Sequence, residues 1–75
     1  MSTTGKTARE LQVMIMGKLR VKHPECDDVI AVLVTPAGGE GHWIVETTIR
    51  NPVSLDCQRA KAAIVRQLRR QHHLV

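Results

Sequence analysis

The stretch VIAVLVTPAGGEGHWIVETTIR, residues 29–50, decides the fold of this 75-residue chain. Its first part, 29–34, is an apolar and mostly β-branched run that is typical of a buried strand. Its last part, 43–50, alternates apolar and polar residues, as a strand does when one of its faces is buried. Two strand patterns joined by a short glycine-bearing loop predict an antiparallel hairpin, with strands over 28–35 and 43–50.

The loop of this hairpin contains a G-x-x-G tetrapeptide, from Gly38 to Gly41. It superficially resembles the loop that holds the nucleic-acid backbone in KH-type RNA-binding domains. In those domains the tetrapeptide joins two helices, whereas here it lies between two strand patterns. Glu40, inside the tetrapeptide, also has the wrong charge for phosphate. We therefore predict a simple hairpin loop with no ligand site at these glycines.

The residues before the hairpin predict a helix over 7–22. Thr7 and Glu10 have the spacing of a capping box, in which each side chain accepts a hydrogen bond from the other residue's backbone N–H. Apolar residues then recur at helical spacing, at Ala8, Leu11, Ile15 and Leu19. Pro24 ends the helix, because a proline disfavours helical geometry in the residue before it. Residues 1–6 are expected to form a flexible tail.

A second helix is predicted over 55–73, with Ser54 as its N-cap. The residues that fall on its core-facing stripe are Cys57, Ala60, Ile64, Leu68 and Val75. The opposite face carries the basic residues Arg59, Arg66, Arg69, Arg70 and His73. Trp43, at the start of the second strand, is expected to anchor the core and to donate its indole N–H to a nearby carbonyl.

The predicted element order is therefore α-β-β-α, in a single small α+β domain over residues 1–75 whose two helices pack on an antiparallel two-stranded hairpin. A domain of this size buries only about 60% of the surface that its unfolded chain exposes. The first strand is apolar on both faces, so either the helices sandwich the hairpin or a second copy covers its outer face or edge. We expect a homodimer, which can extend the sheet.

The two cysteines, Cys26 and Cys57, predict no disulfide framework. The first residues do not combine a basic head with an apolar run, so we expect a cytoplasmic protein with both thiols free and Cys57 buried in the core. His23 and Cys26 are the one close pair of zinc-type ligands apart from the C-terminal histidines. We therefore expect no metal and no cofactor.

Two further classes of function are not expected. No apolar segment approaches the roughly 20 residues that span a bilayer, so we expect no membrane partner. No nucleophile, base and orienting group fall together on the predicted elements, so we expect no enzyme.

Charge is distributed unevenly along the chain, whose net charge is +4. Residues 24–49 contain five acidic residues and no Lys or Arg, whereas residues 50–75 contain six basic residues and one acidic residue. Such asymmetry is typical of a nucleic-acid partner, and equally of a protein whose acidic part faces its own basic part within the chain or across a dimer. No motif in the sequence determines a function, so the expected function is based on the charge pattern.

The leading expectation is a small non-catalytic binding module that contacts an acidic partner through the basic second helix. The residues expected to make this contact are Arg59, Arg66, Arg69 and Arg70. Guanidinium groups suit phosphate because their planar fork donates two hydrogen bonds at once, so nucleic acid comes before an acidic protein as the expected partner. The alternative is a homodimeric protein–protein interaction or assembly module, in which the arginines serve solubility and pairing.

The order of helix, glycine-loop hairpin and helix resembles the first part of BolA-like proteins, with residues 38–45 as the local similarity. The later strand of that family is missing here. Its characteristic histidine after the second strand is missing too, because Arg50 and Asn51 stand where that region begins. The resemblance therefore implies no metal-binding or partner-binding residue.

Overall fold

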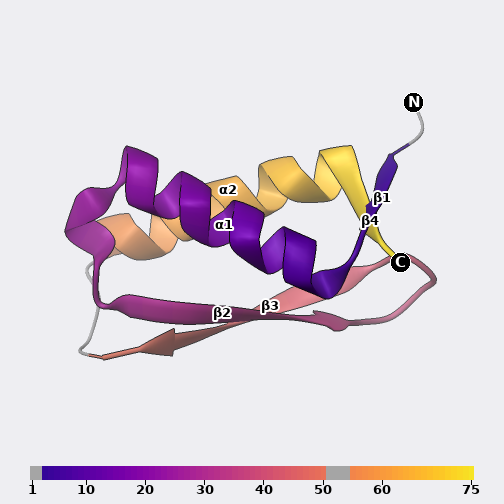
Figure 1. Cartoon of the computed structure of the whole chain (residues 1–75), viewed down its shortest axis with the longest axis horizontal. Helices are drawn as coiled ribbons and strands as arrows, with labels where there is room; N and C mark the ends of the chain where they lie inside the picture. Colours follow the sequence, from indigo (N-terminus) through magenta and orange to yellow (C-terminus); the bar gives the residue numbers. More distant parts are fainter. Residues whose placement is uncertain (1–2, 51–54) are drawn as a thin grey trace.

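The computed structural model describes residues 3–50 and 55–75 of the chain. In order, its elements are β1 (Thr4–Lys6), α1 (Ala8–Lys22), the short 3-10 helix η1 (Pro24–Cys26), β2 (Val29–Pro36), β3 (Trp43–Ile49), α2 (Leu55–Gln71) and β4 (His72–Leu74). The mixed α+β arrangement is as predicted, and β1 and β4 are additions that the sequence did not predict. Both long helices lie on one side of the β2–β3 hairpin, and β1 and β4 lie together at one end of the molecule (Figure 1).

The hairpin has the predicted antiparallel pairing, with Val34 opposite Val45 and Leu33 opposite Glu46. Its loop depends on glycine, because Gly38 and Gly41 have φ angles of 71° and 79°. Residues with a Cβ rarely adopt this left-handed region, whereas glycine does so at no steric cost. The glycines of the G-x-x-G therefore form the turn, as predicted.

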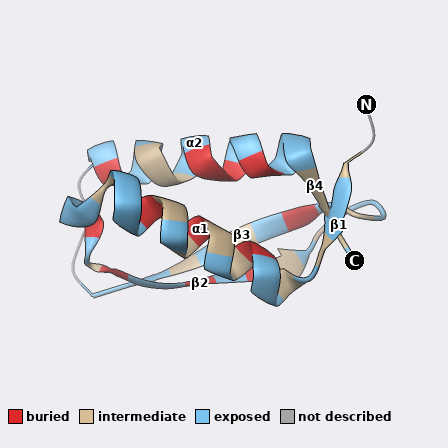
Figure 2. Cartoon of the chain, turned by 45° about the horizontal axis from the view of Figure 1, so that its top comes forward, coloured by how far each residue is buried: buried red, intermediate tan, exposed pale blue. Residues whose placement is uncertain are grey.

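The core lies between the hairpin and the inner faces of the two helices (Figure 2). Its buried members are Leu11, Ile15, Leu19, Cys26, Val29, Val32, Val34, Trp43, Cys57, Ile64, Val65 and Leu68. Trp43 is the predicted anchor, with its indole N–H directed at the carbonyl of His72 at 3.4 Å. Val65 is also buried on the core-facing stripe of α2, which the sequence analysis did not predict. The prediction that Val75 belongs to this stripe is wrong, because Val75 is 71% exposed.

The capping box at the start of α1 is confirmed. The backbone N–H of Glu10 donates to the Thr7 hydroxyl at 3.2 Å, and the backbone N–H of Thr7 donates to the Glu10 carboxylate at 3.1 Å. These bonds satisfy backbone donors that the first helical turn leaves without partners. The break before α2 and its predicted N-cap, Ser54, lie outside the described residues.

The two helices do not sandwich the hairpin, so one of the two predicted arrangements is wrong. Because α1 and α2 share one face, the other face of the hairpin is left to solvent (Figure 1). Ile30, Leu33 and Ile44 are between 44% and 50% exposed as a result.

The prediction that both thiols are free is wrong, because Cys26 and Cys57 form a disulfide with their Cα atoms 5.8 Å apart. η1 turns the chain at the end of α1, and this brings Cys26 to the first turn of α2. Both cysteines are buried, as the core prediction for Cys57 requires. The cytoplasmic location stays a prediction, and the cysteines no longer support it, because disulfides persist mainly in oxidising compartments.

At the opposite end of the molecule, β1 and β4 pair in parallel, with Gly5 opposite His73. The backbone N–H of Leu74 donates to the carbonyl of Gly41 at 3.0 Å, so β4 also holds the hairpin loop. We call β1, β4 and Gly41 together the terminal latch. The predictions of a flexible tail over 1–6 and of a helix reaching residue 73 are therefore wrong for residues 4–6 and for 72–73, since these residues form strands.

Candidate anion-binding surface

Three of the four predicted arginines form one ridge on the exposed side of α2. Arg59, Arg66 and Arg70 are separated by seven and four residues, so at 100° per residue they lie within about 40° of one another around the helix. The buried residues of α2 lie on its other side, because Leu68 and Ile64 face the core. The ridge therefore presents three guanidinium groups to solvent, about 10 Å and 6 Å apart along the helix axis.

The fourth arginine, Arg69, lies on the flank of α2 that faces β3. Its guanidinium carbon is 5.5 Å from the centre of the Trp43 ring, within the range of a cation–π contact. Trp43 is only 4% exposed, so the guanidinium covers an indole that belongs to the core. Arg69 is thus a cation of the surface and a packing residue at the same time.

Lys61 lies on the same flank, nearer the start of α2. Its ammonium group donates a hydrogen bond to the Thr47 hydroxyl of β3 at 2.7 Å. Because this side chain is half-buried and already bonded, Lys61 fixes α2 against β3 and adds positive charge beside the junction.

Two hollows open along the α2–β3 junction, and Arg69 borders both of them. The first encloses about 410 Å³ between Arg69, Trp43 and the hairpin loop, where Ala37 and His42 also line it. The second encloses about 250 Å³ and is lined by Arg66, Arg69 and Lys61 with apolar neighbours. No residue that lines either hollow is acidic. We call the ridge, Arg69, Lys61 and the two hollows the α2 surface.

The structure brings the predicted site residues together on one helix, but in two groups. Arg59, Arg66 and Arg70 point outward as predicted, whereas Arg69 packs on the Trp43 indole. Sequence reasoning did not assign Lys61 or His42 to this surface. Lys61 could have been recognised from its position beside the core stripe of α2, because a lysine there can extend its stem over apolar surface.

Other site types have little support in the described part of the chain. Residues 3–50 and 55–75 contain no group of three or more His, Cys, Asp or Glu side chains arranged to hold a metal ion. Among those same residues, no helix has the combination of length and apolarity that crossing a membrane requires. Because Cys26 and Cys57 are joined in the disulfide, neither has a free thiol.

No protein-family model matches this chain, and neither does any curated protein or solved structure. The resemblance to BolA-like proteins is therefore limited to the element order and the glycine loop. The function of the chain has to be inferred from its own surface chemistry.

Proposed function

We propose that the protein is a small non-catalytic binding module that contacts the phosphate backbone of nucleic acid through the α2 surface. The observation that supports this most is the ridge of Arg59, Arg66 and Arg70 beside Arg69, with no acidic residue lining the adjoining hollows. Arginine forks match phosphate oxygens in geometry and charge, and such contacts supply most of the sequence-independent affinity for nucleic acid.

Within nucleic acids, the α2 surface favours a duplex over a single strand. Single-strand binders stack bases on exposed aromatic rings, and the one aromatic residue outside the histidines, Trp43, is buried beneath Arg69. A straight ridge of three arginines on a regular helix is instead suited to the regular row of phosphates along a duplex.

The test is a salt titration of binding to a random-sequence DNA duplex and to a single strand of the same length. Four contacts predict a slope of log affinity against log salt of about −3.6 for the duplex. Reversing Arg66 and Arg70 to Glu removes two of those contacts, so binding at low salt should be lost. These two residues are better targets than Arg69, whose reversal also disturbs the packing over Trp43.

The matched control reverses two exposed cations of α1, Arg9→Glu with Lys22→Glu, which changes the net charge by the same amount. Binding in this control should keep the salt slope of the parent protein, with a smaller loss of affinity from long-range charge. Equal losses in the two double variants, or no duplex binding at low salt, would refute the proposal.

A second candidate function, a homodimeric assembly module, is favoured by the exposed face of the hairpin. Leu33 and Ile44 lie on this face, and Ile30 points away from α1. The direct cross-strand neighbours of Leu33 and Ile44 are Glu46 and Thr35, and a second copy that packs against this face would remove the exposed apolar side chains from water. This candidate does not compete for the α2 surface, because the exposed hairpin face lies on the other side of the sheet from both helices (Figure 1).

Light scattering between about 1 and 100 μM tests the dimer, since interfaces of standard size hold in this range. Leu33→Glu should give a monomer, because it places a second carboxylate directly opposite Glu46 on the face that a dimer would bury. Val21→Glu is the control, since Val21 is 82% exposed on α1 and lies outside the hairpin. A parent protein that stays monomeric throughout the range rules out this candidate.

A further inference from the structure

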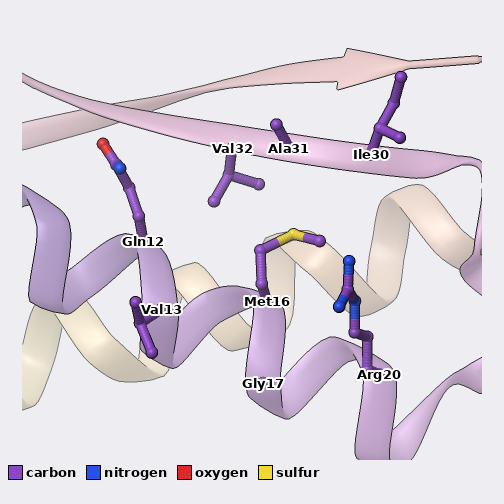
Figure 3. A pocket seen from close by; sticks show the side chains of 8 residues that line it. All are labelled: Gln12, Val13, Met16, Gly17, Arg20, Ile30, Ala31 and Val32. Atoms are coloured by element: carbon purple, nitrogen blue, oxygen red, sulfur yellow. The ribbon is translucent and has the colours of Figure 1, made fainter.

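A second hollow region lies on the far side of the molecule from the α2 surface, between α1 and β2 (Figure 3). Its volume is about 440 Å³, within the range of about 300–1,000 Å³ that is usual for small-molecule and cofactor sites. Gln12, Met16 and Arg20 follow one another at four-residue spacing on α1 and point toward β2, and Val32 points back at them. We call this region the α1–β2 groove.

The wall of the groove formed by β2 is a free sheet edge. Within residues 3–50 and 55–75, β2 pairs with β3 on one side and with no strand on the other. The backbone N–H of Val34 points to the other side, where it donates to the side-chain carbonyl of Gln12 at 3.0 Å. Strand geometry directs the N–H and C=O of Val32, two residues earlier, to this same edge. Gln12 therefore closes one end of the edge, and the backbone N–H and C=O of Val32, a residue that is 7% exposed, face the groove next to it.

The side of the groove that α1 forms is apolar and adaptable. Gly17 lies on the face of α1 turned away from β2, so the side chain of α1 that faces the middle of the groove is Met16 (Figure 3). Met16 is a flexible apolar side chain that adapts to varied neighbours. The nine residues from Gln12 to Arg20 span about 12 Å, which equals about four residues of extended chain.

Arg20 marks the other end of the groove and is the sole charged residue among those that line it. Its guanidinium extends toward β2 near Ile30 (Figure 3), and it makes no ion pair with another described residue. A carboxylate at this end would meet a planar pair of donors. A peptide whose C-terminal carboxylate lies at Arg20 would run antiparallel to β2, which starts at the same end.

We propose that the α1–β2 groove binds the free C-terminal end of an extended peptide, which adds to the edge of β2 as an antiparallel strand and places its carboxylate on Arg20. Main-chain hydrogen bonds to Val32 supply affinity, as in other cases of strand addition, and Met16 receives the side chain that faces α1. This site is independent of the α2 surface, so the protein can hold a peptide and a polyanion at the same time.

The test is a nuclear magnetic resonance titration of the ¹⁵N-labelled full chain with the N-acetylated pentapeptide TVTVV, as the free acid and as the C-terminal amide. The free acid should shift the amide signals of Val32 and Met16, and the amide form should bind at least about tenfold more weakly. Arg20→Glu should cause the same loss. Lys22→Glu, which reverses an exposed charge in the same turn but outside the groove, should cause little.

A second variant separates a blocked groove from a misfolded protein. Met16→Trp puts a bulky side chain into the space beside β2 and should abolish the peptide shifts while the Trp43 indole signal and the melting temperature stay close to those of the parent. No shift with millimolar free acid, or equal binding of acid and amide, overturns the proposal. Concentration-dependent shifts of Val32 and Met16 without peptide also overturn it, since a second copy would then occupy the groove.

Discussion

The two ends of the molecule hold the same pair of helices by different means. At one end, the Cys26–Cys57 disulfide joins the turn after α1 to the start of α2. At the other end, the terminal latch connects the start of α1 to the end of α2 through non-covalent contacts, which include the hydrogen bond from Leu74 to Gly41 and the packing of Leu74 against the core. One end is thus held by a covalent bond that only a reductant breaks. The other end is held by non-covalent contacts, which a denaturant, a change of pH or a bulky substitution can weaken.

This difference explains how so short a chain can keep a core under two helices. Domains of this size rarely obtain more than about 3–5 kcal/mol from one hydrophobic core, so they need an added constraint. The disulfide supplies it at one end, and the latch completes the enclosure at the other by covering Trp43, whose indole N–H is directed at the His72 carbonyl. The following predictions test how unequal the two ends are.

Removing the disulfide should have the largest effect. Its cysteines are 31 residues apart, and closing a loop of this length stabilises a folded chain by about 3–4 kcal/mol in the chain-entropy treatment. The double variant Cys26→Ser with Cys57→Ser should therefore lose about that much free energy of unfolding in a urea titration. A reductant should lower the parent's midpoint and leave the variant's midpoint unchanged. A loss below about 1 kcal/mol in the variant contradicts this prediction.

A substitution in the latch should have a smaller effect. Gly41→Ala forces a left-handed residue to carry a Cβ, which costs about 1–2 kcal/mol, and it brings that Cβ within 3.2 Å of the His73 Cβ. Gly38→Ala is the matched control, because Gly38 has nearly the same φ but a Cβ there meets nothing within 4 Å. The difference between the two unfolding free energies measures the latch contact, and equal values would show that this contact contributes nothing.

The smallest effect should be a dependence of stability on pH that comes from Glu10, at the latch end. The pKa of the Glu10 carboxyl is lowered from 4.5, first by the hydrogen bond from the Thr7 backbone N–H and second by the Thr7 hydroxyl. The nearby charge of Lys6 lowers the pKa further. A lowered folded-state pKa stabilises the fold above pH 4.5, and this contribution is lost as the pH falls through the folded pKa.

Melting temperatures between pH 6 and pH 3 check this dependence. Glu10→Gln should flatten the acid limb of the curve, because the neutral amide does not titrate. The serine double variant should melt lower at every pH but keep the slope that Glu10 contributes, since the disulfide lies at the other end. An unchanged acid limb in Glu10→Gln would contradict the assignment.

Local patterns in the sequence predicted the elements that local physics determines. The Thr7–Glu10 capping box, the glycine turn and the alternation after Trp43 each depend on residues within a few positions of one another, and each is present. The disulfide and the β1–β4 pairing join residues 31 and 68 positions apart, and nothing in their spacing or composition indicates that they meet. Three-residue strands such as β1 also show no periodicity to recognise.

The candidate site was predictable to the same degree. Helical periodicity alone gave the ridge of Arg59, Arg66 and Arg70, which faces outward as expected. The position of Arg69 over Trp43 could not be predicted, because it depends on how α2 lies across β3. The α1–β2 groove was not predicted either, since the sequence did not show which edge of the hairpin stays open or that Gln12 closes one end of it.

The pairing of β1 with β4 also has a consequence for the order in which the chain folds. Closing a loop costs entropy that grows only with the logarithm of its length, so the 68-residue separation of β1 and β4 costs about 0.7 kcal/mol more than the 31 residues between the cysteines. The β1–β4 pair contains only six residues, so its hydrogen bonds offset little of this entropy cost. The pair is therefore stable only after the hairpin and both helices have formed.

Contacts that form last from distant segments are in general the first to open in the native state. The backbone N–H groups of Leu74 and Val75, which donate to Gly41 and Lys6, should therefore exchange with solvent long before those of α1. Opening of the latch would expose Trp43 to solvent, while the disulfide keeps the other ends of the two helices joined. The native-state motion would then be a hinge motion, with the Cys26–Cys57 disulfide at the hinge.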